Sequence, residues 1–167
     1  MGKDNIVIRE IKPEDNAEIE AVIKACFHEF NIPLEGTAYT DIETSRMYES
    51  YQDHNAVYYV IEKNGTILGG GGIKPLKDFD TSVCEIQKMY FSPVVRGKGY
   101  GKRLFEKCLQ AAKTMGYKQC YLESVAQLKA AIHIYKSYGF KPIKRALGNT
   151  GHSSCNIWML KDLKDTN

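Results

Sequence analysis

The 167-residue sequence lacks any apolar stretch near the roughly 18 residues that span a bilayer, which excludes a transmembrane helix. Residues 1–4 lead into no long apolar run, so we expect no secretory signal. Ile6 stands where a myristoylation motif needs Ser or Thr. A net charge of +3 is too small to indicate nucleic-acid binding. We therefore expect a cytoplasmic protein whose partners include neither membrane nor nucleic acid.

Closely spaced metal ligands are missing as well. The five cysteines are odd in number and form no C-x-x-C pair, and the four histidines are scattered without ligand spacing. Most of the cysteines fall in periodic apolar segments, which favours buried reduced thiols over a disulfide or metal framework. We expect no metal site.

Size and composition indicate one domain. With 43% hydrophobic and 26% charged residues, the chain is typical of globular proteins that can bury a core without disulfides. No internal repeat, linker or low-complexity segment interrupts it. We expect residues 1–167 to form a single domain.

Apolar periodicity predicts both helices and strands. Spacings of three and four residues predict helices over residues 13–30, 41–51, 100–115 and 125–138. Alternating or short apolar runs predict strands over residues 6–11, 56–61, 66–73, 82–91, 120–122, 140–143 and 155–160. Asn64-Gly65 is a strong hairpin signal between the second and third strands. Hairpins combined with two strand–helix–strand crossovers predict an α+β fold of three α/β/α layers around a mixed sheet.

Four consecutive glycines, residues 69–72, lie inside one predicted strand. They could leave a bare backbone surface against which a ligand lies. They could also mark a bent or bulged strand whose crowded neighbours leave no room for side chains. The second interpretation is slightly favoured, and the two are compatible.

A glycine-rich loop, residues 96–101, stands between the strand over 82–91 and the helix over 100–115. Its three glycines alternate with bulky residues, and four of the eight side chains from Arg96 to Arg103 are cationic. If a helix begins at Gly99–Gly101, unpaired N–H groups and the positive end of its dipole face the loop. This arrangement predicts a site for a phosphate or pyrophosphate group.

Two common nucleotide loops do not fit this segment. A Walker A motif needs Gly where Arg96 stands and Ser or Thr where Arg103 stands. A dinucleotide-binding fingerprint counted from Gly97 needs Gly or Ala where Lys102 stands. The phosphate group therefore belongs to another class of ligand.

The loop has the pattern R-x-x-G-x-G from Arg96, and it follows a strand and Ser92-Pro93. Over residues 85–101 the sequence resembles the GCN5-related N-acetyltransferase (GNAT) superfamily. A second block, residues 121–140, is similar to the later motif of that family, which ends in L-Y-x-x-x-G-F. The resemblance extends over nearly the whole chain in element order. It implies a mixed, mostly antiparallel sheet of about six or seven strands flanked by about four helices.

The resemblance implies acetyl-CoA as cosubstrate. Backbone N–H groups of the glycine loop would hold the pyrophosphate, and main-chain groups of the preceding strand would pair with the pantetheine arm. An N–H near Met89 would face the thioester carbonyl, where negative charge develops. The implied cofactor-binding residues are Met89, Tyr90, Phe91, Arg96, Gly97, Lys98, Gly99, Tyr100, Gly101 and Lys102.

The resemblance further implies an N-acetyltransferase that passes the acetyl group directly to a primary amine in a ternary complex. Tyr135 occupies the position of the tyrosine that protonates the CoA sulfur. Glu85 occupies the position of the general base in histone-acetylating members. Strand alternation predicts that Glu85, Gln87 and Met89 point to one face. Together these residues predict the reacting centre.

Two features keep alternatives open. Glu123 is a second candidate base, by analogy with ribosomal-protein acetylating members. Leu128 stands where many members have an Asn that contacts the pantetheine, so one polar contact is lost. The alternative function is a catalytically idle module that binds or senses acyl-CoA. The presence of Tyr135 and Glu85 favours the enzyme.

The acceptor side is expected to come from the loop over 31–40, the helix over 41–51 and the loop over 148–154. The candidate residues are His28, Glu29, Glu35, Tyr39, Asp41, His152 and Trp158. Carboxylates there would favour a cationic amine, either a small molecule or a peptide. The sequence does not choose among amines, and a homodimer stays open.

Overall fold

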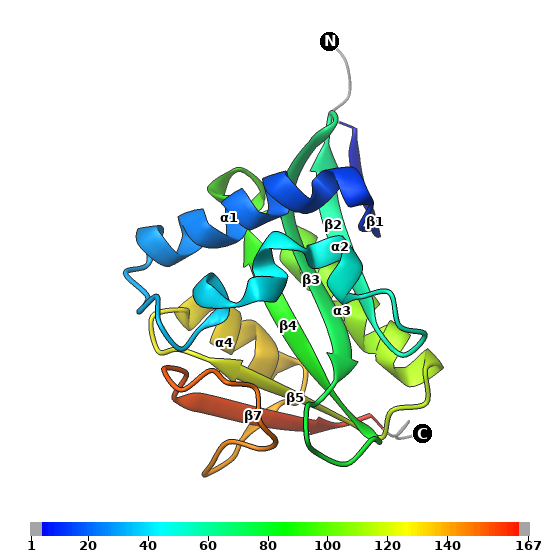
Figure 1. Ribbon diagram of the computed structural model, residues 1–167, viewed down its shortest axis with the longest axis vertical. Helices are drawn as coiled ribbons and strands as arrows, with labels where there is room; N and C mark the ends of the chain where they lie inside the picture. The colour runs from blue at the N-terminus through cyan, green and yellow to red at the C-terminus, as the bar shows by residue number, and fades with distance from the viewer. Residues whose placement is uncertain (1–4, 164–167) are drawn as a thin grey trace.

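A seven-stranded sheet with the order β1-β2-β3-β4-β5-β7-β6 runs through the computed structural model, which describes residues 5–163 (Figure 1). The strands are β1 (Ile6–Glu10), β2 (Val57–Lys63), β3 (Thr66–Pro75), β4 (Val83–Phe91), β5 (Gln119–Ser124), β6 (Lys141–Pro142) and β7 (Ile157–Asp162). Residues 1–4, on which the expectation about a signal drew, lie outside the described part. Within that part, no helix is long and apolar enough to cross a membrane.

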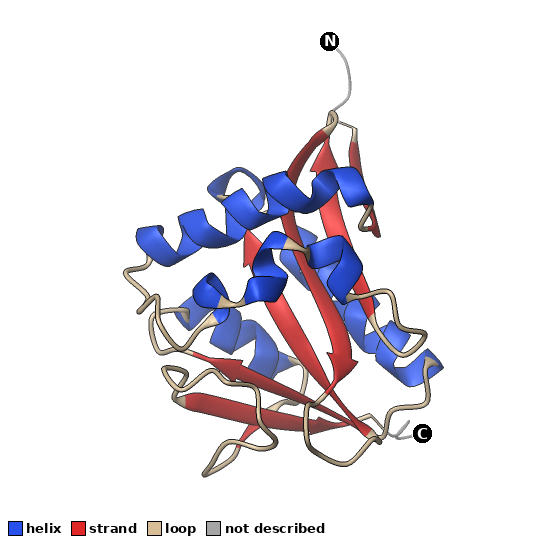
Figure 2. Ribbon diagram, viewed as in Figure 1, coloured by secondary structure: helices blue, strands red, loops and turns tan. Residues whose placement is uncertain are grey.

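Helices cover both faces of the sheet (Figure 2). They are α1 (Asn16–Glu29), α2 (Met47–Ser50), α3 (Tyr100–Thr114) and α4 (Lys129–Ser137). Helices α1 and α2 lie on one face, and α3 and α4 lie on the other (Figure 1). One apolar cluster packs beneath α3 and α4 and a second beneath α1. The three-layer α+β architecture predicted from the sequence is thereby confirmed.

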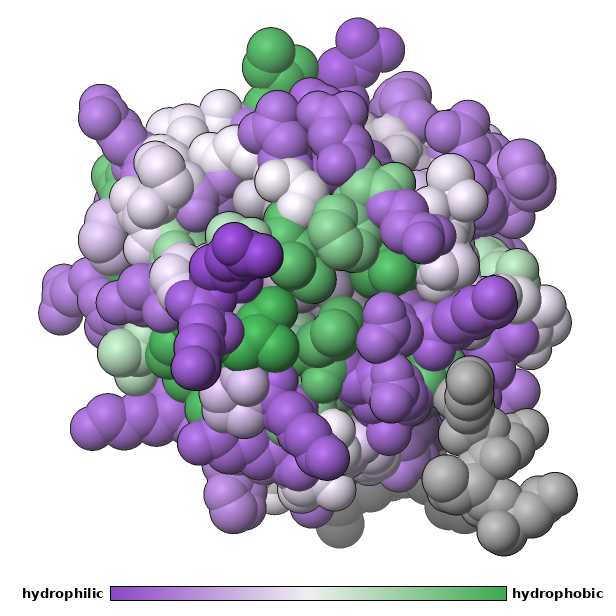
Figure 3. All heavy atoms as spheres, turned by 90° about the horizontal axis from the view of Figure 1, so that it is seen from below, coloured by the Kyte–Doolittle hydropathy of each residue, from purple (hydrophilic) through white to green (hydrophobic). Residues whose placement is uncertain are grey.

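A third, smaller cluster lies toward β7. It packs Leu76, Val83 and Tyr121 against partly buried residues that include Ile143 and Leu147. Seen from below, the molecule also shows hydrophobic side chains between polar ones near the middle of that face (Figure 3).

Within residues 5–163 the sheet contains one parallel contact, between β4 and β5. These strands pair over only three positions, the last of which joins Glu85 to Tyr121. Strand β4 nevertheless continues to Phe91 and β5 to Ser124. Beyond these paired positions no ladder joins the two strands, so β4 and β5 separate there. The parallel pairing of β4 with β5 confirms the predicted crossover through α3. Strands β5 and β6 both run antiparallel to β7 and are therefore parallel to each other, which confirms the crossover through α4.

Two predicted helices differ from the structure. The helix expected over 41–51 is broken into a 3₁₀ helix, Ile42–Ser45, and the single turn α2, with non-helical backbone at Arg46. Thr44 and Ser45 donate their hydroxyls to backbone carbonyls, and such bonds compete with a regular helix. Helix α4 begins at Lys129 because the residues from 125 to 128 form a separate turn.

The four glycines of β3 are explained by crowding. A Cβ added to Gly70 would lie 2.6 Å from an atom of the Tyr58 ring, and a Cβ added to Gly72 would lie 2.7 Å from another atom of that ring. The ring of Tyr58 thus lies flat across β3 from its own position in β2. From there its hydroxyl donates to the Lys88 carbonyl in β4, at 2.7 Å. The interpretation of crowded neighbours is confirmed, whereas the bulge beside Gly70 and Gly72 lies in the neighbouring strand β4.

The hydroxyl of Tyr58 meets β4 at a β-bulge. Between the pairs Gly70–Tyr90 and Gly72–Gln87, β4 carries one more residue than β3. Lys88 lies inside this interval with φ 51°, a left-handed conformation that is uncommon outside glycine. The bulge changes which side chains face which layer.

The predicted common face of Glu85, Gln87 and Met89 is therefore wrong for Met89. Gln87 donates to Glu85 and accepts from Tyr51 on the α1 side. Met89 instead packs into the cluster beneath α3. The additional residue of the bulge shifts the alternation by one position, since side chains alternate only along a regular strand.

Candidate functional site

A cavity of about 530 Å³ lies between the end of β4, the glycine loop and α4. Eight of the ten predicted cofactor-binding residues line it: Met89, Tyr90, Phe91, Arg96, Gly97, Gly99, Gly101 and Lys102. The remaining two, Lys98 and Tyr100, belong to the same loop and the first residue of α3 but are not among the lining residues. We call this space the donor cavity.

The glycine loop presents a helix start to the donor cavity. Gly97 and Gly99 have φ values of 73° and 86°, which a residue with a side chain adopts only with strain. Helix α3 begins at Tyr100, as predicted. The first N–H groups of a helix have no acceptor within it, so those of Tyr100, Gly101 and Lys102 are available to an anion. Open space surrounds both Gly97 and Gly99.

Arg96 has a different environment from the other cations of the loop. Its guanidinium forms a bidentate ion pair with Glu29 at the end of α1. It also donates to the Phe91 carbonyl at 2.7 and 2.9 Å, and it stacks on Phe30. The hydrogen bond from Arg96 lowers the pKa of Glu29. Arg96 thus ties α1 to the end of β4, while Lys102 stays exposed at the cavity.

A second cavity of about 60 Å³ adjoins the first. Both cavities are lined by Met89, Tyr90, Leu128 and Tyr135, so they meet where β4 and β5 have separated. The second cavity is also lined by polar groups, namely Thr37, Glu85, Gln87, Lys88, Glu123, Ser124, His152 and Cys155. We call it the acceptor cavity.

Glu85 is only 4% exposed and lines the acceptor cavity. Its carboxylate accepts a hydrogen bond of 2.6 Å from Gln87. Burial raises the pKa of Glu85 to about 7; the bond from Gln87 opposes the shift and the charge of Glu123 adds to it. A carboxyl group with this pKa exchanges protons near neutral pH.

Tyr135 lies at the junction of the two cavities. It is 7% exposed, and its ring packs 5.3 Å from that of Phe105 between centroids. Burial raises the pKa of its phenol to about 12. The group therefore keeps its proton at neutral pH and can donate it.

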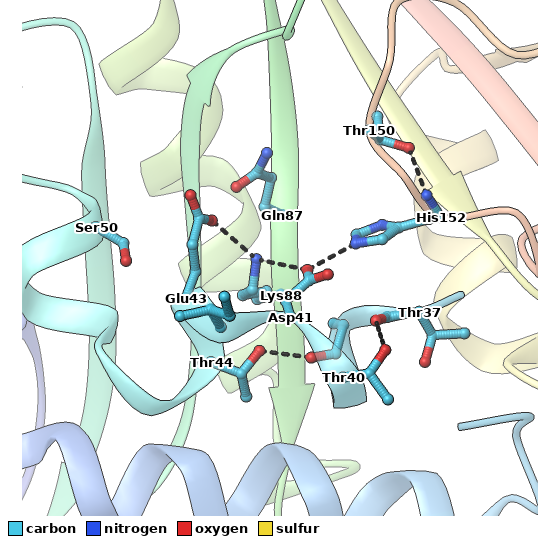
Figure 4. A network of polar contacts seen from close by, with 12 residues as sticks. Thr37, Thr40, Asp41, Glu43, Thr44, Ser50, Gln87, Lys88, Thr150 and His152 are labelled. Atoms are coloured by element: carbon cyan, nitrogen blue, oxygen red, sulfur yellow. Dashed lines mark hydrogen bonds and ion pairs between the residues drawn. The ribbon is translucent and has the colours of Figure 1, made fainter. Parts of the chain in front are cut away.

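An ion-pair network connects the acceptor cavity to the segment before α2 (Figure 4). His152 Nε2 lies 2.7 Å from an Asp41 oxygen, and Lys88 Nζ lies 3.4 Å from the same oxygen. Lys88 also approaches Glu43 at 3.5 Å. Burial alone would raise the pKa of Asp41, but the hydrogen bond with His152 lowers it. Burial alone would lower the pKa of His152, but the hydrogen bond with Asp41 raises it. Fixed charges therefore surround this cavity.

Of the predicted acceptor residues, only His152 lines the cavity, and Asp41 reaches it through His152. The other five, His28, Glu29, Glu35, Tyr39 and Trp158, are not among the lining residues. His28 and Tyr39 form a hydrogen bond with each other, and Trp158 packs against the apolar cluster beside β7. The two predicted loops do meet there: Ser154 donates to the carbonyls of residues 35 and 36.

Sequence reasoning missed Lys88, Cys155 and the role of Tyr58. The position of Lys88 in the middle of a predicted strand was a usable signal, because a buried ammonium needs carboxylate partners. Cys155 was assigned to a buried strand, yet it precedes β7 and lines the acceptor cavity. No local signal marks Tyr58, whose role depends on two neighbouring strands.

Known proteins resemble this chain in sequence and in fold. The Acetyltransferase (GNAT) family model matches residues 19–140. A protein of Escherichia coli (strain K12) named Uncharacterized N-acetyltransferase YjgM is 40% identical over 158 residues, which cover 94% of this chain and 95% of that protein.

Solved structures share the fold. An acetyltransferase of the GNAT family from Staphylococcus aureus Mu50 aligns with a TM-score of 0.83 and 23% identity, over 96% of this chain and 100% of that one. A Salmonella typhimurium protein described as a putative acetyltransferase with its cofactor acetyl-CoA aligns with a TM-score of 0.75 and 22% identity, over 98% of this chain and 96% of that one.

Proposed function

The chain belongs to the acetyltransferase (GNAT) family, and from that premise we propose that it transfers an acetyl group from acetyl-CoA directly to a primary amine. The observation that carries this proposal is the junction of the two cavities. A large cavity with a helix start at one end meets a small, carboxylate-lined cavity at Met89, Tyr90, Leu128 and Tyr135. A donor and an acceptor can therefore be held at once with their reacting ends together.

The donor cavity fits a CoA-type ligand. The first N–H groups of α3, with Lys102 at the cavity wall, would bind the pyrophosphate. Met89 and Tyr90 would pair with the pantetheine through their main chains. The Phe91 carbonyl already accepts two bonds from Arg96, so it contributes less to that pairing.

The residues at the junction would move the protons. Bound acetyl-CoA would supply the thioester that the amine attacks. Glu85 would take a proton from the ammonium, and the Met89 N–H would donate to the thioester oxygen as the new C–N bond forms. As the C–S bond breaks, Tyr135 would donate its phenolic proton to the departing sulfur and the nitrogen would lose its second proton to solvent. Solvent would then reprotonate the phenolate of Tyr135. Glu123 is the alternative base on the same cavity wall.

Acetyl-CoA binding is tested by calorimetry on the wild type and on Gly99→Glu. The new carboxylate would stand at the pyrophosphate position, and we expect measurable binding to disappear. Gly116→Glu is the matched control: its φ of 87° and open surroundings are like those of Gly99, but it follows the other end of α3. Undiminished affinity in Gly99→Glu would contradict the assignment of the loop.

Turnover is tested by free-thiol release from acetyl-CoA with a panel of primary amines. Tyr135→Phe should bind acetyl-CoA like the wild type but turn over about 100-fold or more slowly, because the departing sulfur loses its proton donor. Tyr138→Phe is the control, since its hydroxyl contacts Glu106 outside both cavities. An unchanged rate in Tyr135→Phe would assign that residue to the core. Binding without amine-dependent release would favour the idle acyl-CoA-binding module.

A further inference from the structure

We propose that Glu123, His152 and Cys155 form a binding site for a zinc-type divalent cation in the wall of the acceptor cavity. A carboxylate oxygen, an imidazole nitrogen and the Cys155 sulfur all lie within 4.8 Å of one another. All three residues line the same cavity and are partly buried. The expectation of no metal site is explained by sequence distance, since Glu123 is far from His152 and Cys155 along the chain.

The fold brings the three residues together in two steps. Strands β5 and β7 are antiparallel, so Ser124 at the end of β5 pairs with Ile157 at the start of β7. The chain just before β7 therefore passes beside Glu123. A turn in which the Cys155 N–H donates to the His152 carbonyl, at 3.1 Å, then places these two side chains near each other. The cluster is thus built on a sheet edge and a hydrogen-bonded turn.

The imidazole of His152 is oriented as in known metal sites. Its Nε2 lies 2.7 Å from Asp41, and Lys88 holds the same carboxylate (Figure 4). Metal-binding histidines usually donate the N–H of their second nitrogen to a carboxylate. With Nε2 engaged in this way, Nδ1 is the nitrogen that faces Glu123, at 3.8 Å from its Oε1.

That 3.8 Å separation leaves room for a shared ion between the two groups. It is too long for a hydrogen bond. It is near the roughly 3.3–3.7 Å that separate two ligands of one tetrahedral zinc ion. Oε2 of Glu123 accepts a bond of 2.6 Å from Tyr121, which leaves Oε1 on the side of His152. Thr150 donates to Oε1, but a carboxylate oxygen can accept twice.

The donor set selects the kind of cation. One sulfur, one nitrogen and one oxygen suit Zn²⁺ and its substitute Co²⁺, whereas Mg²⁺ and Ca²⁺ take oxygen ligands. Cys155 binds as the thiolate and its displaced proton passes to solvent, while the neutral imidazole binds through the lone pair of Nδ1. Three protein ligands leave a fourth position that faces the acceptor cavity.

The position of the site has a consequence for the reaction. An ion there occupies part of a cavity of only about 60 Å³ and engages Glu123. Zinc should therefore compete with the amine and inhibit transfer. This consequence rests on the proposed function, whereas cation binding itself does not.

Cobalt binding tests the site without any reference to activity. Untagged, chelator-treated full-length protein is titrated with Co²⁺ and followed by absorption. We expect a near-ultraviolet thiolate-to-cobalt band that Zn²⁺ abolishes by displacement. The band should be missing from Cys155→Ser and from His152→Ala, and it should persist in Cys108→Ala, which removes a core thiol. Circular dichroism checks that each variant is folded.

The wild-type titration is decisive even if a variant fails to fold. No thiolate band, or cobalt bound through oxygen and nitrogen alone, would overturn the proposal. An undiminished band in Cys155→Ser would do so as well. Acetyl-CoA calorimetry on the same sample reports on the donor cavity separately, so failure of the metal site and failure of the proposed function give different results.

Discussion

Glu85 combines burial with a proton equilibrium near neutral pH. In the folded chain its pKa is raised from 4.5 to about 7, chiefly by burial. The folded state therefore binds this proton more tightly than the unfolded state does. The resulting stabilisation is fully present below pH 4.5 and is lost as the pH rises through about 7. The same deprotonation produces the base that the proposed reaction needs, so stability and activity should change in opposite directions.

We expect Glu85→Gln to remove this pH dependence. Between about pH 5 and about pH 8, the wild type should lose up to roughly 3 kcal/mol of unfolding free energy relative to the variant, since each pKa unit corresponds to about 1.4 kcal/mol. Urea unfolding at both pH values measures this loss of unfolding free energy. Glu35→Gln is the control, because Glu35 is exposed. In the thiol-release assay, the rise in wild-type rate near neutral pH should disappear in Glu85→Gln. Equal pH dependence in both proteins would mean that Glu85 is not the titrating group.

Among the structural elements, the bulge of β4 depends on contacts between strands. Tyr58 reaches the Lys88 carbonyl only because Gly70 and Gly72 leave its ring space to cross β3. The bulge in turn directs Met89 toward α3 and the donor cavity. A strand, a run of glycines and one tyrosine thus act together to shape the proposed thioester site.

Tyr58→Phe tests this dependence. The variant leaves a buried carbonyl without its donor, so we expect about 1–3 kcal/mol less unfolding free energy and weaker acetyl-CoA binding. Tyr59→Phe is a matched control, because it lies on the same strand and faces the other layer. Denaturant unfolding and calorimetry measure both effects. If the two variants behave alike, the bulge holds its shape without the hydroxyl of Tyr58.

The elements that the sequence predicted well are those with local signals. The start of α3 was predictable because Gly99 and the apolar stripe after it lie within a few turns of each other. The helix over 41–51 was wrong because hydroxyls of Thr44 and Ser45 bond to the backbone there. The bulge at Lys88 was not predictable, since its cause lies in β2 and β3.

At the scale of the whole molecule, the two cavities differ in how far apart their lining residues lie in the sequence. Most residues that line the donor cavity come from two short segments of the chain, residues 89–105 and 127–135. The acceptor cavity joins Thr37 and Ala38 to β4, β5 and His152. The contact between Asp41 and His152 spans 111 positions. Motifs therefore marked most residues that line the donor cavity, whereas most residues that line the acceptor cavity became apparent only in three dimensions.

This division leads to a prediction about reaction order. Because the two cavities meet while remaining separate spaces, donor and acceptor should bind together before either product leaves. Initial rates with varied acetyl-CoA and amine should give intersecting double-reciprocal lines. Cys155 lines the acceptor cavity, but burial raises the pKa of its thiol to about 12, so it should not attack the thioester first.

Mass spectrometry after incubation with acetyl-CoA alone checks the second half of this prediction. The mass of the protein should stay unchanged, and the acetyl group should appear only on the amine once the amine is added. Parallel double-reciprocal lines together with an acetylated Cys155 would show a two-step transfer through the cysteine. In that case the thioester would react with Cys155 at the junction of the cavities. Glu85 and Tyr135 would then need roles other than those proposed for direct attack.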